Sequence, residues 1–379
     1  MSMEQKVLVI NSGSSSIKYK LLAMNSRETL IEEKIEAKGN LDDAVRHLDH
    51  QLQALAPLAD DIIAVGHRVV HGGREFSGPT YIDDSTIQSM MSLERYAPLH
   101  TRSAVAGIRV AEGIFPNIPQ VAVFDTAFHT TMPEHASTYA LPRALTETYG
   151  IRRTGFHGIS AQYTLKAIAK ALVLPPAEFN LIVAHLGAGS SITAIQAGRS
   201  VDTSMGFTPL EGLVMSTRCG DIDPSLPLML QEDLGLTPQE VYEMLNNECG
   251  LLGLCGTGDM RSIHSLASSG YEPAILALDV YCYRIRKYIG AYCAVLGHVD
   301  ALAFTGGIGE NDSLLRSMIC EGLEFFGMEL AEEKNASVHG DIHLISNAES
   351  LTQVFVVKTD EESEIAEQVL KLVEEGRAL

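Results

Sequence analysis

The sequence predicts an α/β protein built from two related domains. Its 379 residues exceed what one ordinary hydrophobic core supports, so two domains are expected. The apolar run 7–10 leads into a turn of small polar residues and then into a second strand, the pattern of a buried strand, a loop of phosphate size and a return strand. A similar unit recurs at 181–193, and the two Ser-Ser-Ile triplets, 15–17 and 190–192, lie 175 positions apart. The repetition predicts related domains that face each other, with a nucleotide on one side of a cleft and an acceptor on the other.

The composition narrows the class of partner. Hydrophobic residues make up 46% and charged residues 20% of the chain, as in soluble globular proteins. The formal net charge of −20 disfavours nucleic acid and anionic membranes, because both require a basic face. No apolar run approaches a membrane span, and the N-terminal residues lack the apolar core of a signal peptide. The six cysteines show no metal-binding or redox spacing, so we expect reduced thiols in a cytoplasmic protein.

The first half of the chain alternates strands and helices. Residues 7–23 predict a hairpin, 41–55 a helix, and 62–70 a strand that ends before a pair of glycines. Residues 103–113 predict a helix with small residues along one side. The short apolar run 121–125 predicts a buried strand that delivers an aspartate at its carboxyl end, where open α/β sheets usually hold their ligands.

The crossing between the domains is expected at 129–155, which is rich in Pro, Thr and Tyr and has no clear periodicity. We therefore expect an N-terminal domain at 1–147 and a nucleotide-binding domain at 148–360.

The second half repeats the alternation. The expected elements are strands at 181–186 and 192–196, an active-site loop at 205–224, helices at 238–247 and 273–296, a strand at 301–305 and a glycine-rich turn at 306–311. The last segment carries Ile365, Val369, Leu372 and Val373 at helical spacing, so it predicts an amphipathic helix. We expect this helix, 361–379, to complete the N-terminal domain.

The chain has no P-loop motif and no protein-kinase signature. Phosphoryl transfer can still be built on other loops that supply backbone N–H groups, cations, a metal site and an in-line acceptor. Asn11 ends the first strand inside a Gly/Ser turn, where its amide can orient Mg²⁺ or phosphate, or can simply cap the turn. Lys18 on the return strand can reach phosphates or lie solvated.

Two residues at strand ends are candidates for the acceptor side. Arg68 is flanked by histidines and glycines, and its guanidinium fork suits a small carboxylate, the alternative being a structural ion pair. Asp125 can act as a base or hold the acceptor, the alternative being a helix N-cap.

Further candidates lie in glycine-rich loops. His157 lies in a loop between glycines, and Arg218 lies among small residues, where it suits the equatorial oxygens of a transferring phosphoryl group. The segments 185–189 and 306–311 each follow a buried strand and resemble phosphate or adenosine loops. The segment 259–261 can contact a nucleotide or serve only the fold.

Taken in order, these segments resemble the acetate kinase family, in the acetokinase branch of the sugar kinase/Hsp70/actin superfamily. The resemblance covers nearly the whole chain through eight motifs: Asn11-Ser12-Gly13-Ser14-Ser15-Ser16, Gly66-His67-Arg68-Val69-Val70-His71-Gly72-Gly73, Ala97-Pro98-Leu99-His100, Val123-Phe124-Asp125-Thr126-Ala127-Phe128-His129, Arg152-Arg153-Thr154-Gly155-Phe156-His157-Gly158, His185-Leu186-Gly187, Thr217-Arg218-Cys219-Gly220-Asp221 and Phe304-Thr305-Gly306-Gly307-Ile308-Gly309-Glu310-Asn311.

The resemblance implies a reaction, a fold and an assembly. The reaction is acetate + ATP ⇌ acetyl phosphate + ADP by direct in-line transfer, with Mg²⁺, or Mn²⁺ in its place. The fold is two duplicated actin-like (ribonuclease H-like) domains around a hinged cleft, and the assembly is a homodimer.

It also implies a role for each matching residue. Arg68 would hold the acetate carboxylate, Asp125 would be the catalytic carboxylate, and His157 and Arg218 would stabilise the transition state. Asn11 and Glu361 would position Mg²⁺. The methyl pocket would be Val70, Leu99, Phe156 and Pro209, and the ATP site would be Lys18, His185, Leu186, Gly187, Ala188, Gly189, Asp259, Met260, Arg261, Gly307, Ile308, Gly309, Glu310 and Asn311.

The chain departs from the family at several positions. Ala188 replaces an Asn in the second phosphate loop, which removes one contact to the nucleotide phosphates, and Asp360 replaces the Asn before Glu361. The other departures are Thr101, Ala161, Ser216 and Cys219; none removes a charged catalytic group.

Three alternatives stay open at this point. A sister acyl kinase would act on propionate or butyrate, and an apolar pocket separates one methylene by only about 1–3 kcal/mol. We expect Val70 to favour acetate, with some leakage to propionate. The others are an actin- or Hsp70-like nucleotide switch, and a kinase-dead nucleotide sensor suggested by Ala188.

Overall fold

The computed structural model describes residues 4–13, 16–36, 41–94 and 98–377. The chain divides into two compact units. Unit 1 comprises Met1–Thr130, Phe156–Tyr163 and Asp360–Leu379, and unit 2 comprises Thr131–Gly155 and Thr164–Thr359.

The units differ in detail from the expected domains. Residues 131–147 belong to unit 2 and 156–163 belong to unit 1. Compact units are not by themselves independently folding domains, so the boundary expected after residue 147 stays a prediction.

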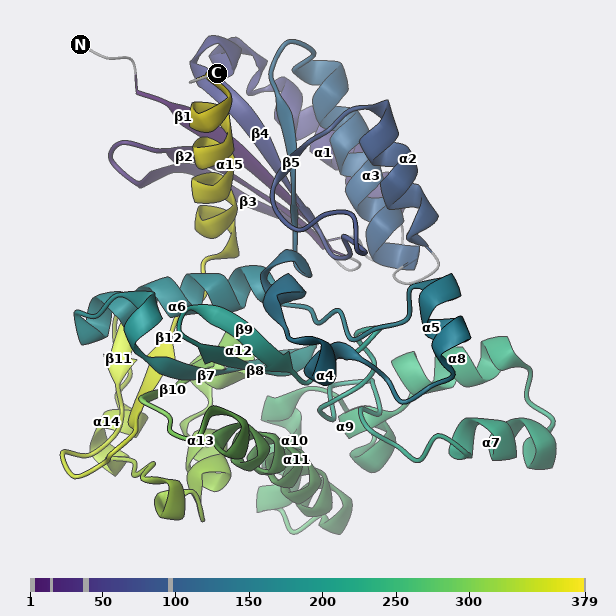
Figure 1. Ribbon diagram of the computed structural model, residues 1–379, viewed down its shortest axis with the longest axis vertical. Helices are drawn as coiled ribbons and strands as arrows, with labels where there is room; N and C mark the ends of the chain where they lie inside the picture. Colours follow the sequence, from purple (N-terminus) through teal and green to yellow (C-terminus); the bar gives the residue numbers. More distant parts are fainter. Residues whose placement is uncertain (1–3, 14–15, 37–40, 95–97, 378–379) are drawn as a thin grey trace. The chain divides into compact units, whose positions relative to one another are not determined.

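Unit 1 is built on a six-stranded mixed sheet (Figure 1). Its strands, in spatial order, are β3 (Glu28–Glu36), β2 (Ser16–Ala23), β1 (Lys6–Ser12), β4 (Ile62–Val69), β6 (Gln120–Phe124) and β5 (Thr80–Tyr81). β1 pairs antiparallel with β2 and parallel with β4, β4 is parallel to β6, and both edge strands are antiparallel to their neighbours.

Unit 2 repeats this topology strand for strand. Its order is β9 (Arg199–Thr203), β8 (Ser190–Gln196), β7 (Asn180–Leu186), β10 (Ala301–Thr305), β12 (Gln353–Val357) and β11 (Ile342–Leu344). The sequence of antiparallel and parallel pairings is the same as in unit 1. The prediction of a duplicated α/β fold is therefore confirmed.

The alternation of side chains along β1 explains how unit 1 is layered. Leu8 and Ile10 face α1 (Leu41–Gln53) and α3 (Pro98–Ile114), whereas Val7 and Val9 pack with the C-terminal helix α15 (Glu361–Arg377). Successive side chains of a strand point to opposite faces, so the apolar run of β1 supplies core residues to both faces of the sheet. α15 consequently lies along the sheet of unit 1 (Figure 1).

Unit 2 has one large core on a face of its sheet. Ile182, Ala184 and Leu186 of β7 pack there with Tyr281 and Ile285 of the long helix α11 (Glu272–Leu296). The remaining helices of the two units are α2 (Asp84–Ser92), α4 (Glu134–Ser137), α5 (Arg143–Tyr149), α6 (Gly158–Leu172), α7 (Leu226–Leu234), α8 (Pro238–Asn247), α9 (Gly250–Cys255), α10 (Met260–Ser268), α12 (Gly306–Asn311), α13 (Ser313–Cys320) and α14 (Glu332–Ala336), with short 3₁₀ turns at 56–61, 127–131, 176–178 and 324–326.

Two expected loops have a defined structure of their own. The glycine-rich turn 306–311 is the short helix α12, and the aperiodic stretch 129–155 contains α4 and α5. Residues 205–224, all within the described chain, form neither helix nor strand, as expected. Among the described helices, none is both long enough and apolar enough to cross a bilayer.

Candidate active site

Three predicted site residues of unit 1 meet at one edge of its sheet. Asn11 lies near the end of β1, Arg68 near the end of β4, and Asp125 directly after β6. These strands are parallel neighbours, so their carboxyl ends lie together. Arg68 donates from Nε and Nη2 to the two carboxylate oxygens of Asp125, at 3.1 and 2.7 Å. Its Nη1 donates to Oδ1 of Asn11 at 3.2 Å.

The start of α15 adds two carboxylates to this edge. Glu361 lies 3.6 Å from Nη1 of Arg68, and Glu362 accepts a hydrogen bond of 2.8 Å from Nδ2 of Asn11. Sequence reasoning selected Glu361 and missed Glu362. The local sequence carries no specific signal for Glu362, because acidic residues in a first helical turn are already favoured by the helix dipole. Its proximity to Asn11 depends on a contact spanning 351 positions.

The cluster carries more negative than positive charge. Burial alone lowers the pKa of the Arg68 guanidinium, but Asp125, Glu361 and Glu362 more than offset this, so its pKa lies above the ordinary value. The cluster contains three carboxylates, Asp125, Glu361 and Glu362, but only one guanidinium, so carboxylate oxygens remain that can bind a cation. Mg²⁺ is typically bound by one or two carboxylates together with water and substrate phosphates. The oxygens of Asn11, Glu361 and Glu362 fit this requirement, although the described residues include no cluster of three acidic, His or Cys side chains of metal-site geometry.

His157 precedes α6 in a constrained turn. Its φ of 57° lies in the left-handed region, which is uncommon for a residue with a side chain. The next residue, Gly158, donates its N–H to the carbonyl of Asp125 at 3.0 Å. A Cβ on Gly158 would lie only 2.2 Å from that oxygen, so glycine is required there. The turn is thereby fixed to the residue that binds Arg68.

Phe156 is tied to the same segment. Its carbonyl accepts a 3.0 Å hydrogen bond from Nε2 of His129, and its buried ring meets the edge of His71 at 5.6 Å between centroids. Burial lowers the pKa of His129 to about 4, which keeps the imidazole neutral near pH 7. Val70 is also buried. Leu99 lies in the first turn of α3, but its side chain is outside the described part of the chain.

Lys18 is the unit 1 residue predicted for the nucleotide. It pairs with Asn11 across the β1–β2 hairpin, and its side chain is exposed. The neighbouring Ser14 and Ser15 of the first loop lie outside the described residues.

In unit 2, two predicted nucleotide turns lie side by side. β7 and β10 are parallel, with His185 opposite Thr305, so the turn 187–189 and α12 follow adjacent strand ends. Gly306 has a φ of 76°, and a Cβ there would lie 2.7 Å from the carbonyl oxygen of Leu186. This position requires glycine because the two turns approach so closely.

Glu310 and Asn311 hold α12 in shape. A carboxylate oxygen of Glu310 accepts from the N–H of Gly306 at 3.1 Å and of Thr359 at 3.0 Å. Nδ2 of Asn311 donates to the carbonyl of Gly307 at 2.9 Å. In this structure both side chains therefore stabilise the turn.

The segment 259–261 begins α10. Asp259 is its N-cap and binds the exposed guanidinium of Arg261 at 3.1 Å, whereas Met260 lies in the core of unit 2. His264 of the same helix lies 2.7 Å from Asp312, directly after α12. This contact links α10 to the end of α12, and both helices contain residues predicted for the ATP site.

The loop 205–224 connects these pieces. Ser216 donates from its N–H to the carbonyl of Ala188 at 3.3 Å and from Oγ to the carbonyl of Gly258 at 2.9 Å. Two residues on, Arg218 donates to the carbonyl of Pro209 at 3.3 Å. Burial lowers the pKa of Arg218, and among the described residues the hydrogen-bond partners of this side chain are the carbonyl of Pro209 and the sulfur of Met215, with no acid among them. A guanidinium without an acidic partner is suited to an incoming anion.

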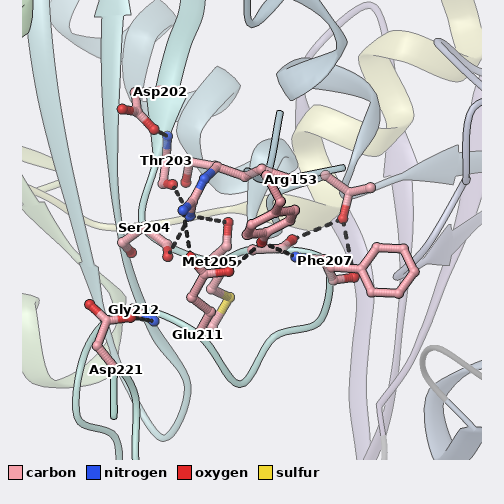
Figure 2. A network of polar contacts seen from close by, with 12 residues as sticks. Arg153, Asp202, Thr203, Ser204, Met205, Phe207, Glu211, Gly212 and Asp221 are labelled. Carbon is pink, nitrogen blue, oxygen red and sulfur yellow. Dashed lines mark hydrogen bonds and ion pairs between the residues drawn. The ribbon is translucent and has the colours of Figure 1, made fainter. Parts of the chain in front are cut away.

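Arg153, by contrast, serves the fold. It donates from Nη1 to the carbonyls of Thr203, Ser204 and Met205 at 2.9–3.2 Å and from Nη2 to Glu211 at 2.5 Å (Figure 2). Glu211 also accepts from the hydroxyl of Tyr139. Arg153 therefore anchors the first part of the loop 205–224 with both of its terminal nitrogens.

Comparison with known proteins adds an independent finding. Residues 27–367 match the model of the acetokinase family. The chain is 45% identical to the acetate kinase of Streptomyces avermitilis over 394 residues, covering 97% of each chain. It is similar to the crystal structure of Porphyromonas gingivalis acetate kinase, with a TM-score of 0.89 and 38% identity over 97% of this chain and 100% of that one. It is also similar to a propionate kinase from Francisella tularensis, with a TM-score of 0.88 and 38% identity over 96% and 98% of the two chains.

Proposed function

Because the chain belongs to the acetokinase family, we propose that it catalyses the reversible transfer of the γ-phosphoryl group of ATP to acetate, giving acetyl phosphate and ADP. The observation that carries the assignment of the acceptor is Arg68, a partly exposed guanidinium held in a fixed orientation by two hydrogen bonds to the buried Asp125. A fixed guanidinium fork is the preferred partner of a small carboxylate.

Arg68 has one nitrogen that can be released for a substrate. Nη1 makes the longer contacts, 3.2 Å to Asn11 and 3.6 Å to Glu361, and these are the oxygens suited to a divalent cation. When they serve a cation, Nη1 is left to donate to the acetate carboxylate. Acetate and the cation would thus be bound by the same cluster.

Asp125 need not act as a base. A carboxylic acid ionises near pH 4, so acetate is already a nucleophile at neutral pH and no proton has to be removed. Asp125 is almost fully buried, 1% exposed, and holds Arg68. We assign it the role of orienting Arg68 and, through its backbone carbonyl, the turn of His157.

Transfer brings two anions together, and positive groups must offset their charge. In-line phosphoryl transfer depends on positioning and on electrostatic stabilisation of the equatorial oxygens. We assign this stabilisation to Arg218 and His157. Mg²⁺, held by Asn11, Glu361 and Glu362, would neutralise charge on the phosphates.

The nucleotide is assigned to unit 2. Two adjacent glycine turns, 187–189 and 306–311, follow parallel strand ends, as phosphate-binding turns commonly do. The other unit 2 residues assigned to the nucleotide lie on or beside these turns: His185 on β7, Ile308 on α12, and 259–261 at the start of α10. Ala188 contributes no amide side chain, so its backbone alone can serve phosphate there.

A hydroxamate assay of acyl phosphate formation tests this function directly. Acetate, propionate and butyrate are compared with ATP and Mg²⁺, and pyrophosphate replaces ATP in a parallel series. We expect the highest kcat/KM with ATP and acetate. Absence of product with every pair, from a folded protein, would refute the proposal and favour a nucleotide switch or sensor.

Propionate is the second candidate acceptor, because one similar structure is a propionate kinase. The buried Val70 and Phe156 favour the smaller methyl group, and one methylene separates substrates by about 10- to 200-fold. Higher kcat/KM for propionate than for acetate would make this chain a propionate kinase.

We further expect a homodimer in the cytoplasm. Light scattering coupled to size-exclusion chromatography tests the first expectation, and cell fractionation tests the second. The hinge and cleft implied by the family also stay predictions.

A further inference from the structure

Lys20 is a nearly buried lysine outside the cluster described above. It lies on β2 and is 6% exposed. A buried ammonium is costly unless it is paired. Its Nζ lies 3.0 Å from Oδ1 of Asp360 and 3.8 Å from Glu32, its partner on β3. Burial lowers the pKa of Lys20, but Asp360, Glu32 and Glu362 outweigh that effect and raise it overall, so Lys20 is charged.

Asp360 is the residue on which α15 begins. Its carboxylate accepts from the N–H of Ser363 at 3.1 Å and from the hydroxyl of Ser363 at 2.6 Å, while its carbonyl accepts from the N–H of Glu364 at 3.2 Å. These contacts make Asp360 a helix N-cap, which satisfies an otherwise unpaired N–H and fixes the direction of the first turn. Lys20 therefore forms its ion pair with the N-cap residue of α15.

The two residues after this cap are the carboxylates of the cluster. Glu361 approaches Arg68 at 3.6 Å, and Glu362 accepts from Asn11 at 2.8 Å. Lys20 and Asn11 lie on the paired strands β2 and β1. The start of α15 is thus attached to one strand through Asp360 and to the other through Glu362, and the direction of Glu361 follows from both attachments.

We propose that the Lys20–Asp360 ion pair is a positioning device for the divalent cation: it sets the orientation of Glu361 and Glu362 and thereby the affinity for the cation bound with ADP or ATP. The proposal rests on the proposed kinase function. It makes Lys20 and Asp360 positioning residues, since both would act through Glu361 and Glu362 and not by binding the cation or a substrate themselves.

Removal of the Lys20 charge has opposite expected effects on cation affinity under the two explanations, positioning and direct electrostatic repulsion. The positive charge of Lys20 lies close to Glu362, so by charge alone its removal would strengthen cation binding. By positioning, its removal weakens cation binding, because the side chain of Asp360, which is 30% exposed, loses the partner that fixes its direction and turns to water, so that the cap is lost. Outer-shell partners of metal ligands typically contribute 10- to 100-fold to affinity.

The test measures Mn²⁺ binding to the full-length protein with ADP by electron paramagnetic resonance, beside the Mg²⁺ dependence of acyl phosphate formation. We expect Lys20→Met to raise the Kd for Mn²⁺ about tenfold, with a larger effect on the Mg²⁺ concentration for half-maximal rate than on kcat. Lys20→Arg should recover most of the affinity. The double variant Lys20→Met/Asp360→Asn should bind better than Lys20→Met alone, because no charge is left unpaired.

Lys6→Met is the matched control. Lys6 forms an ion pair of 2.8 Å with Asp61 at the opposite end of β1 from Asn11, so Mn²⁺ affinity should not change. If Lys20→Met does not fold, two variants of Asp360 provide the test. Asp360→Leu removes both the ion pair and the cap and should cause the larger loss of affinity, whereas Asp360→Asn keeps the cap, loses the ion pair and should cause a smaller loss; an unchanged Kd for Asp360→Asn would exclude a role for the ion pair.

An unchanged or lower Kd in a folded Lys20→Met protein would overturn the proposal. If the wild-type protein is active and binds Mn²⁺ while the variants match it, only this inference fails. If the wild-type protein forms no acyl phosphate, the proposed function fails first.

Discussion

Arg153 and Arg218 show how surroundings decide what an arginine does. Neither side chain is fully exposed. Arg153 donates hydrogen bonds to Glu211 and to three backbone carbonyls. Within the described part of the chain, Arg218 donates only to the carbonyl of Pro209 and weakly to the sulfur of Met215. Burying an arginine without an acidic partner costs stability. Such a cost is commonly tolerated at functional sites, so Arg218 is the arginine of unit 2 to test first.

We expect Arg218→Ala to lower kcat by about 10³-fold with a modest change in the KM for acetate, because arginines that stabilise a transferring phosphoryl group contribute that much to rate. Steady-state kinetics by the hydroxamate assay measures both constants. Arg199→Ala, on the exposed side of β9, is the control and should match the wild type. An unchanged kcat for Arg218→Ala would remove the residue from the mechanism.

Two buried histidines make stability depend on pH. Burial lowers the pKa of His67 and of His129 to about 4, whereas both take up a proton near pH 6.5 in the unfolded chain. Between these values the unfolded state binds more protons, so the free energy of unfolding falls as the pH falls. The stabilisation is complete above about pH 6.5 and is lost towards pH 4, by up to about 3 kcal/mol for each histidine.

Denaturant unfolding at pH 7, 6, 5 and 4.5 measures this loss. His129→Gln should flatten the pH dependence, because the amide can still donate to the carbonyl of Phe156 but does not titrate. The exposed His135 provides the control, since His135→Gln should leave the slope unchanged. A wild-type protein equally stable at pH 7 and pH 4.5 would contradict this account.

At the scale of elements, the position of α15 depends on a glycine in the strand beneath it. A Cβ on Gly66 of β4 would lie 2.8 Å from Val369 and 2.9 Å from Ile365, both fully buried on α15. The helix can therefore pack closely on the sheet only where β4 has no side chain. The same helix carries Glu361 and Glu362 at its start, so this packing also places the acidic cluster.

We expect Gly66→Ala to lower the free energy of unfolding by about 1–3 kcal/mol through overpacking, and to weaken Mn²⁺ binding because α15 is displaced. Gly66→Ala/Val369→Ala should recover part of both losses, since the second change removes the methyl group that clashes. Gly113→Ala in α3, where nothing lies within 4 Å of the added Cβ, should be neutral or stabilising. Additive effects of the two changes at the Gly66–Val369 contact would argue against this packing.

At the scale of the molecule, the sequence predicts two kinds of feature: strands whose side chains are buried, and polar residues at the carboxyl ends of those strands. The apolar runs of β1, β4, β6, β7 and β10 identify the central strands, and the polar residues at their ends identify Asn11, Arg68 and Asp125. The edge strands escape such reasoning, and the central strand β12 was also missed, although four of its five residues are buried and apolar. β3 is mostly exposed, with only Ile35 buried, and charged residues separate Ile35 from Leu30 and Ile31. It therefore lacks the regular apolar pattern that marks a strand, and its place is fixed by pairing with β2.

The contacts that complete the site are tertiary, which explains why sequence reasoning did not find them. Lys20 and Asp360 are 340 positions apart and Asn11 and Glu362 are 351 apart, and no local pattern specifies either pair. Sequence likewise indicated Met260 and Glu310 as residues of the ATP site without indicating that the first belongs to the core of unit 2 and the second holds α12. The fold determines which atoms of a motif remain available to a ligand.

The assignment of the nucleotide to one unit leads to a prediction for the whole molecule. The glycine turns, α10 and the loop 205–224 are joined by contacts within unit 2, through Ser216, His264 and the close approach of Gly306 to Leu186. A ligand that binds the native state suppresses the opening of the elements it contacts. Hydrogen exchange with ADP and Mg²⁺ should therefore slow in peptides covering 187–189, 258–264 and 306–312, with β3 of unit 1 unchanged as the internal control. Acetate alone should not protect these peptides. Protection by ADP confined to unit 1 would refute the assignment, and it would do so even if the protein proved to be an active acetate kinase.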